Sequence, residues 1–112
     1  MQINEKLVNG VTVLTIHGKI LMGDDIAVKK KIDDLVGKGV KDIVLDLAEV
    51  PYIDSSGLGE LIRCYTTMRK AGGNLKLANL TDKIVDLLTI TKLVTVFDYY
   101  KSVELAVDSF SS

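Results

Sequence analysis

The sequence lacks the features that mark several large classes of protein. Cys64 is the only cysteine among the 112 residues, so the chain cannot form a disulfide framework or a zinc site from cysteines. No apolar run approaches the length of about 18 residues that a membrane-spanning helix needs. The formal net charge is −1, which provides no broad basic surface for nucleic acid or membranes.

The start of the chain also lacks a basic segment followed by an apolar one, the pattern of a secretory signal. We therefore expect a cytoplasmic protein with no nucleic-acid partner and no direct insertion into a membrane. Its one basic cluster, Lys29-Lys30-Lys31, lies beside Asp33 and Asp34 on a predicted helix, which indicates a solvated face. With 47% hydrophobic and 26% charged residues, the composition predicts one globular domain over residues 1–112.

The first third of the chain predicts a β-hairpin and then a helix. Residues 2–7 and 11–17 alternate apolar and polar side chains around Asn9-Gly10, which favours a tight type I′ turn. Gly23-Asp24-Asp25 then predicts the start of a helix that ends near Gly37 and Gly39. The apolar residues of this helix recur at helical spacing: Val28, Ile32, Leu35 and Val36.

The middle of the chain predicts a buried strand followed by a long helix. Residues 43–47 are continuously apolar apart from Asp46 and rich in β-branched side chains, as is typical of a central parallel strand. The helix runs from about Ser56 to Lys70 and ends before Gly72-Gly73. It carries a single apolar stripe: Leu58, Leu61, Ile62, Tyr65 and Met68.

The last third predicts two more strands and two more helices. Residues 74–78 form a strand, and Thr81 or Asp82 caps a short helix that carries Ile84, Val85, Leu87 and Leu88. Residues 94–97 predict the final strand. Ser102 caps a final helix, whose apolar face consists of Val103, Ala106, Val107 and Phe110.

The resulting order of elements is ββαβαβαβα. Crossovers between parallel strands of one sheet are right-handed almost without exception, so the later strands should all run parallel. We therefore predict an α/β fold in which a mixed β-sheet begins with a hairpin and continues with alternating helices and strands.

Residues 53–59, which read Ile-Asp-Ser-Ser-Gly-Leu-Gly, lie at the turn between the central strand and the long helix. A helix N-terminus offers unpaired N–H groups and a partial positive charge, which suit a phosphate. One serine can simply cap the helix. Capping requires only one hydroxyl, however, and does not require Gly57 and Gly59, which we interpret as leaving the backbone uncovered for a partner. These residues favour a serine that is modified over one that performs chemistry.

Enzyme motifs are incomplete throughout the chain. A hydrolase nucleophile elbow would need glycine where Ile53 stands, and His17 is the only histidine available for a catalytic triad. Residues 18–23 have the glycine spacing of a nucleotide-binding loop, but Asp24-Asp25 replaces the required Lys-Ser/Thr. Gly57-x-Gly59 lacks the third glycine of a dinucleotide fingerprint. We therefore expect a protein that is not an enzyme and that has no cofactor.

The remaining candidate residues have ordinary structural interpretations. Four aspartates could bind a divalent metal, but their spacing does not demand one. They are Asp24, Asp25, Asp46 and Asp54. Cys64 lies within the long helix between residues of its apolar stripe, which indicates a small, partly buried packing residue.

At residues 54–59 the chain resembles the anti-sigma factor antagonists of the STAS domain superfamily. Their hallmark is Asp-Ser-(Ser/Thr/Ala)-Gly-(Leu/Val/Ile)-Gly between a buried strand and a helix. The resemblance covers nearly the whole chain and includes the hairpin ending in Gly18, Asp46-Leu47 before the motif, the strand entry at Gly72-Gly73, and Leu93 and Phe97 after the short helix.

This resemblance implies a binding module that is controlled by phosphorylation. The serine directly after the aspartate, here Ser55, is the phosphorylated residue, and the adjoining residues bind the partner: Asp54, Ser56, Gly57, Leu58 and Gly59. In the family, the unphosphorylated antagonist binds an anti-sigma factor, which is a serine kinase, and so frees the sigma factor. A metal-dependent serine phosphatase resets the switch.

One position departs from the family pattern. Leu21 stands where many members carry an acid near the phosphorylated serine. Either Asp24 or Asp25 compensates for this acid, or the protein has another partner. The alternatives to an anti-sigma factor antagonist are a STAS accessory subunit of a lipid or anion transporter, a scaffold in a signalling assembly, and a small enzyme that uses Ser55 or the acidic cluster.

Overall fold

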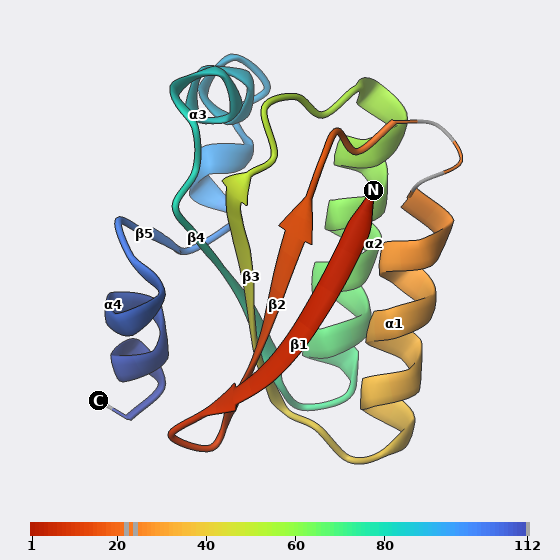
Figure 1. Cartoon of the computed structure of the whole chain (residues 1–112), viewed down its shortest axis with the longest axis vertical. Helices are drawn as coiled ribbons and strands as arrows, with labels where there is room; N and C mark the ends of the chain where they lie inside the picture. The colour runs from red at the N-terminus through yellow and green to blue at the C-terminus, as the bar shows by residue number, and fades with distance from the viewer. Residues whose placement is uncertain (22, 24, 112) are drawn as a thin grey trace.

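The computed structural model describes residues 1–21, 23 and 25–111, and its elements follow the predicted order (Figure 1). The predicted helix start at Gly23-Asp24-Asp25 falls partly outside the described residues, because Asp24 is not among them. The elements are β1 (Gln2–Val8), β2 (Val11–His17), α1 (Asp25–Gly37), β3 (Asp42–Glu49), α2 (Ser55–Lys70), β4 (Asn74–Ala78), α3 (Asp82–Ile90), η1 (Leu93–Thr95), β5 (Tyr99–Tyr100), α4 (Val103–Asp108) and η2 (Ser109–Ser111).

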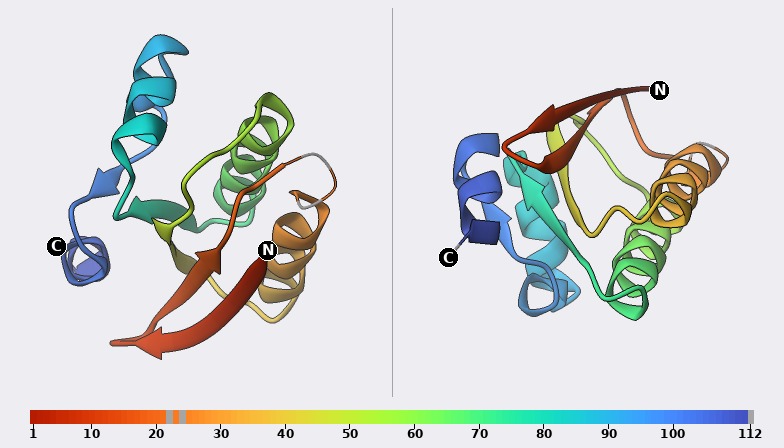
Figure 2. Two further views of the ribbon diagram at one scale, coloured as in Figure 1. Left: turned by 45° about the horizontal axis from the view of Figure 1, so that its top comes forward. Right: turned by 90° about the horizontal axis from the view of Figure 1, so that it is seen from below.

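The five strands form one mixed sheet in the order β1-β2-β3-β4-β5. Strand β1 is antiparallel to β2, and each of the later pairs is parallel, which confirms the predicted fold class. Helices α1 and α2 cover one face of the sheet and α4 lies on the other, as the two turned views show (Figure 2). Helix α3 stands at the end of the sheet where the parallel strands finish (Figure 1).

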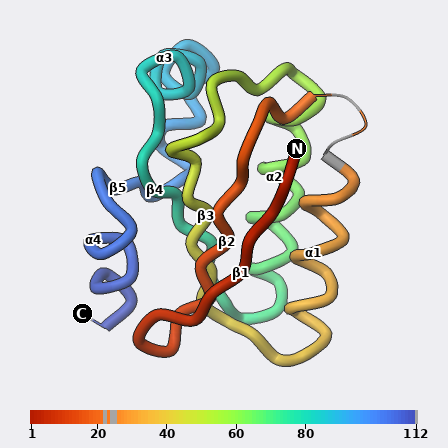
Figure 3. Tube along the Cα trace, in the orientation of Figure 1, coloured from red at the N-terminus to blue at the C-terminus, as the bar shows by residue number. Residues whose placement is uncertain are grey.

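The N-terminal hairpin has the predicted turn. Val8 pairs with Val11, which leaves Asn9 and Gly10 as a two-residue loop with φ values of 50° and 82°. Positive φ at both central residues defines the type I′ turn, whose twist matches that of the flanking strands. The tube view shows the hairpin at the lower corner of the domain, with β1 along the outer edge of the sheet (Figure 3).

Two apolar clusters fill the two sides of the sheet. The larger one lies under α1 and α2 and contains the predicted helix stripes, including Ile32, Leu35, Leu58, Leu61 and Met68. The smaller one lies under α4 and contains Val11, Val13, Val44, Ala78, Ala106 and Val107. Beside it the buried Lys76 donates a hydrogen bond to Ser109 and lies over the Phe110 ring, 4.3 Å from its centroid. This contact ties the C-terminal turn to the sheet.

The predicted strand over residues 94–97 is wrong. Residues 93–95 form the 3₁₀-helix η1, and the final strand is the two-residue β5. The Leu93 carbonyl accepts hydrogen bonds from the amides of both Val96 and Phe97, so this segment satisfies its backbone locally. Phe97 is buried and packs edge-on against Tyr65. The β-branched run suggested a strand, but tertiary packing overrides such a propensity.

The start of α2 is fixed by a close backbone contact. Ile20 continues the direction of β2 and forms an isolated parallel bridge with Ile53, and its carbonyl accepts a hydrogen bond from the Asp54 amide at 3.2 Å. A Cβ atom on Gly57 would lie 2.5 Å from this same Ile20 oxygen. The interpretation that Gly57 leaves backbone uncovered for a partner is therefore wrong, because its bare Cα is used inside the domain.

The two glycines of α2 should respond in opposite ways to a methyl group. Gly57→Ala should lower the free energy of unfolding by about 1–3 kcal/mol, because the new Cβ overlaps the Ile20 carbonyl. Gly59→Ala should raise it by up to about 1 kcal/mol, because the space there is open and alanine favours a helix. Urea unfolding of both variants checks this, and equal stabilities would contradict it.

The stripe of α2 should contribute to stability as core. Leu61 is 1% exposed, so Leu61→Ala should lower the free energy of unfolding by about 2–5 kcal/mol through lost burial and a cavity. Leu105→Ala is the matched control, since Leu105 is 53% exposed on α4 and should cost no more than about 0.5 kcal/mol. Thermal or urea unfolding measures both, and a small effect at Leu61 would show that the packing of α2 is misassigned.

Candidate functional site

The first turn of α2 is capped by an aspartate, not by a serine. Asp54 has an extended backbone with φ −84° and ψ 179°, and its Oδ1 accepts a hydrogen bond from the Gly57 amide at 2.8 Å. Its carbonyl accepts the first helical hydrogen bond, from the Leu58 amide at 2.9 Å. The structural alternative in which a serine hydroxyl caps the helix is therefore wrong. Ser55 and Ser56 occupy the first two helical positions, and their hydroxyls are not needed for capping.

The predicted site residues lie together but differ in their exposure. Ser55 is exposed, whereas Asp54, Ser56 and Gly59 are partly exposed. Gly57 and Leu58 are buried inside the domain. Ser55 is thus the residue of this motif that presents its side chain most openly. Phosphorylation of Ser55 and the partner-binding role of the other five motif residues stay predictions.

Gly59 lies one helical turn beyond Ser55 and leaves space above it. A Cβ atom at Gly59 would meet only the Arg63 guanidinium, at 4.0 Å. Helical side chains tilt back towards the N-terminus, so a larger residue at this position would cover the turn that carries Ser55. The interpretation of an uncovered backbone is therefore supported at Gly59, although it is wrong at Gly57.

The two serines have different electrostatic surroundings. Ser56 has Glu60 four residues later on the same helix face, and the Glu60 side chain is only 12% exposed. Glu60 forms an ion pair with Arg63 at 2.7 Å, which partly compensates its charge. Ser55 has glycine at the corresponding position. A negative charge added at Ser56 would therefore meet a largely buried carboxylate one turn away, whereas at Ser55 the corresponding position is glycine and the nearby acid is the capping Asp54.

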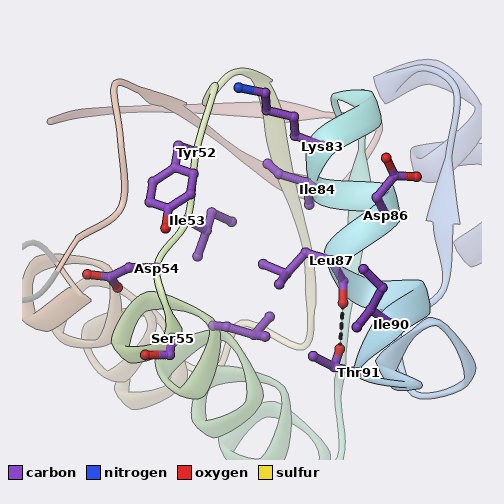
Figure 4. Close-up of a pocket in the computed structure, with 11 residues that line it drawn as sticks. Tyr52, Ile53, Asp54, Ser55, Lys83, Ile84, Asp86, Leu87, Ile90 and Thr91 are labelled. Carbon is purple, nitrogen blue, oxygen red and sulfur yellow. Dashed lines mark hydrogen bonds between the residues drawn. The ribbon is translucent and has the colours of Figure 1, made fainter.

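A groove of about 700 Å³ lies directly beside Ser55 (Figure 4). One wall comes from the start of α2 and the segment before it, with Tyr52, Ile53, Asp54, Ser55 and Leu58. The other wall is the side of α3 that bears Lys83, Ile84, Asp86, Leu87, Ile90 and Thr91. Figure 4 shows Ser55 on one side and Ile90 and Thr91 on the other, with the Leu87 side chain pointing into the space between them.

Sequence reasoning missed the α3 wall of this groove. It named four apolar residues on this helix, Ile84, Val85, Leu87 and Leu88, of which Ile84 and Leu88 are buried. Ile90 follows Ile84 and Leu87 at a spacing of three residues but is 79% exposed, and Tyr52 on the opposite wall is 48% exposed. The available signal was that the spacing of Ile84, Leu87 and Ile90 continues to the last residue of the helix.

The side chains considered for catalysis each have a structural explanation in their contacts or their burial. His17 lies in β2 and forms a hydrogen bond across the hairpin with Asn4. Burial raises the pKa of the Cys64 thiol to about 12, so this thiol remains protonated at neutral pH. Asp46 accepts hydrogen bonds from the Asn79 side chain at 3.0 Å and from the Ala48 amide. These contacts account for each group without a catalytic role.

The structure gives no support to a metal centre or a membrane span in the part of the chain that it describes. Over residues 1–21, 23 and 25–111, no three His, Cys, Asp or Glu side chains gather closely enough to hold an ion. None of the helices described is both long and apolar enough to cross a membrane. Leu21 is partly buried, while Asp24 and the side chain of Asp25 lie outside the described residues.

Comparison with known proteins matches this chain and its fold to one family. The STAS domain matches residues 2–106. The anti-sigma-B factor antagonist of Bacillus subtilis is 33% identical over 85 residues, which are 76% of this chain and 77% of that protein. The crystal structure of an anti-sigma factor antagonist from Mycobacterium paratuberculosis has a TM-score of 0.87 at 22% identity and covers 99% of this chain and 94% of its own.

The fold is also that of a protein known in a phosphorylated state. The phosphorylated form of the Bacillus cell fate determinant SpoIIAA has a TM-score of 0.75 at 18% identity, covering 97% of this chain and 99% of its own. The match over residues 2–106, the mixed five-stranded sheet and the Asp-Ser-Ser-Gly-Leu-Gly turn agree with one another. The chain therefore belongs to the STAS domain family.

Proposed function

We propose that this chain is an anti-sigma factor antagonist, a binding module that is active when Ser55 is unphosphorylated. The observation that carries the proposal is the exposed Ser55 hydroxyl at the first position of α2, in a turn whose capping is already provided by Asp54. The relative from Bacillus subtilis bears the name of such an antagonist, which supports the same function. The partner is an anti-sigma factor that is also a serine kinase.

The chemistry of the turn suits a phosphate acceptor better than an enzyme nucleophile. No hydrogen bond joins the Ser55 hydroxyl to any other residue that the structure describes, so no base is in place to activate it. The kinase must supply the base that takes the hydroxyl proton, while the γ-phosphoryl group moves from ATP to Oγ and ADP leaves. A serine phosphatase reverses the modification by hydrolysing the phosphoester. Both enzymes and this chain would meet in the cytoplasm.

The geometry of α2 supports Ser55 over Ser56 as the acceptor. A phosphate carries a charge of about −1.5 to −2 at neutral pH. On Ser56 it would face the largely buried Glu60 carboxylate one turn away, whereas on Ser55 it would face Gly59 one turn away and the capping Asp54 beside it. Gly59 also leaves room above Ser55 for a kinase to approach.

The switch works through local repulsion and desolvation, without refolding. The N–H groups and dipole at the start of α2 partly compensate a phosphate on Ser55, although the neighbouring Asp54 opposes it. The Gly57 contact with Ile20 holds this turn in place. A partner pressed against the phosphate must remove its water or meet like charge, and such penalties reach several kcal/mol. SpoIIAA matches this fold with the same TM-score of 0.75 in its unphosphorylated and phosphorylated forms.

Phosphorylation should occur on Ser55 alone. When the chain is incubated with ATP and the purified anti-sigma kinase of its source organism, mass spectrometry should locate one phosphate on Ser55. Ser56→Ala should still be phosphorylated and Ser55→Ala should not. The isolated chain with ATP should stay unmodified, because its described residues provide neither a base nor a nucleotide loop at Ser55. A phosphate on Ser56, or on neither serine, would contradict the assignment.

Phosphorylation should abolish binding without changing the backbone. The phosphorylated chain should bind the anti-sigma factor at least 100-fold more weakly, equivalent to about 2.8 kcal/mol, because the phosphate loses water in the interface. Amide hydrogen exchange across α2 should remain the same in the two forms. Calorimetry and exchange mass spectrometry measure these quantities. Loss of protection across α2 would instead indicate an order–disorder switch.

A further inference from the structure

Strand β1 leaves one complete edge of the sheet without a partner. It pairs with β2 over all seven of its residues, and no segment that the structure describes pairs with its other side. The view from below shows β1 as the outermost strand of the sheet (Figure 2). The strand at the opposite edge, β5, has only two residues. An uncovered row of N–H and C=O groups on a strand as long as β1 is a template for pairing with another chain.

The hairpin determines which residues of β1 direct their backbone groups outwards. Its two-residue turn closes on Val8 and Val11, which therefore form a hydrogen-bonded pair. Residues along an antiparallel pair of strands alternate between hydrogen-bonded and non-hydrogen-bonded positions. The even-numbered residues of β1 thus bond to β2, and the outward N–H and C=O groups belong to Ile3, Glu5 and Leu7.

The same three residues place their side chains on the side of the sheet that carries α1. Ile3 packs against the larger apolar cluster, and Glu5 forms an ion pair with Lys31 of α1. Because side chains alternate between the two faces of a strand, Leu7 projects on this side as well. Leu7 is 72% exposed, and a further strand on this edge would cover it.

We propose that β1 pairs antiparallel with β1 of a second copy of this chain, with Glu5 of both copies at the two-fold axis, so that the two sheets become continuous. Hydrogen-bonded pairs then form between the two Glu5 residues and, twice, between Ile3 and Leu7. Each exposed Leu7 is placed against the partly buried Ile3 of the other copy. The edge is therefore self-complementary, as a two-fold symmetric interface requires.

Other registers of the two strands match less well. Because outward-facing residues must pair with outward-facing residues, the second strand can shift only by two residues at a time. A shift that centres Asn4 on the axis puts Ile3 opposite Glu5 twice. A shift that centres Lys6 puts two lysines opposite each other and Leu7 opposite Glu5. Both shifts replace an apolar pair with an apolar residue facing a charge.

The two Glu5 carboxylates are the unfavourable contact of the proposed register. Like charges directly opposite each other on adjacent strands are destabilising. Each carboxylate already forms an ion pair with Lys31 of its own copy, however, so the four groups together carry no net charge. The other charged residue of the strand, Lys6, lies opposite the neutral Asn4 of the second copy. The dimer therefore depends on Lys31, although Lys31 lies on α1.

A single pair of strands makes a small interface. A strand of seven residues is about 24 Å long, and a contact of that length and one strand's width buries less than the roughly 1,000 Å² expected of a stable complex. We therefore expect a reversible dimer that dissociates on dilution, with a dissociation constant between about 1 μM and about 1 mM.

The dimer would be bivalent. A two-fold axis normal to the sheet reverses the strand direction in the second copy, so the carboxyl ends of the parallel strands point in opposite directions. Ser55, which follows β3 at this end, would then lie at opposite ends of the dimer and outside the interface. One dimer could bind two partner molecules. This consequence rests on the proposed function, whereas the pairing of β1 does not.

The first test measures self-association by sedimentation equilibrium. Leu7→Asp should weaken the dimer at least tenfold, because it introduces a charge into both apolar contacts. Leu105→Asp is the matched control: Leu105 is also exposed, but it lies on α4, which packs against β3, β4 and β5, and the dissociation constant should change less than twofold. A wild-type chain that stays monomeric at about 1 mM, or a Leu7→Asp chain that associates like the wild type, would overturn the proposal.

The second test concerns the charges at the axis. Lys31→Ala should weaken the dimer severalfold, and added salt should reduce this difference, because the two Glu5 carboxylates lose their compensation. Lys30→Ala is the control, since Lys30 is exposed on the same helix and should change the dissociation constant less than twofold. A Lys31→Ala dimer as tight as that of the wild type would contradict the placement of Glu5 at the axis.

The third test identifies the register by disulfide formation. Asn4 and Lys6 form a non-hydrogen-bonded pair in the proposed register, with Cα atoms about 4.5 Å apart, which suits a disulfide. A mixture of Asn4→Cys and Lys6→Cys chains with oxidised glutathione should yield a linked heterodimer, whereas neither variant alone should link to itself. Cys64 is buried and does not compete. Self-linking of either variant would show a shifted register, and the absence of a link in the mixture would overturn the proposed pairing.

Discussion

The contact between Gly57 and the Ile20 carbonyl determines where α2 begins. This one oxygen accepts the Asp54 amide hydrogen bond and also touches the bare Cα side of the first helical turn. The segment that follows β2 is thereby joined to the segment that follows β3 at the carboxyl end of the sheet. The cap, the exposed serine and the adjoining groove all take their positions from this junction.

The arrangement divides one short motif into two groups of residues. Gly57 and Leu58 are buried, and the partly exposed Asp54 caps the helix, so these three residues build the turn by close approach, burial and capping. Ser55 and Gly59 face outwards, one carrying the hydroxyl and the other leaving space above it. Within these six adjacent residues, those that build the turn therefore alternate with those that lie at the surface. Its glycines look alike in the sequence but satisfy unrelated requirements.

The sequence predicted those features that depend on neighbouring residues. The Asn9-Gly10 turn and the stripe of α2 follow from local preference and helical spacing, and both are present. The strand over residues 94–97 failed because hydrogen bonds to Leu93 and the burial of Phe97 outweigh β-propensity. A serine was the cap that the sequence suggested, but Asp54 caps α2, because the contact with Ile20 determines where the turn ends. The groove was missed because its walls lie about 30 positions apart in the chain.

A rigid turn also determines how the number of binding-competent molecules would depend on phosphorylation. Because Ile20 and Asp54 hold the first turn of α2 in one geometry, the proposed switch would bind without a prior rearrangement of this turn. Its apparent affinity is then not reduced by a fraction of incompetent molecules. Each dephosphorylation event would yield one competent binder without a conformational delay. The output would follow the number of unmodified chains in proportion, so the steepness of any response must arise in the enzymes that add and remove the phosphate.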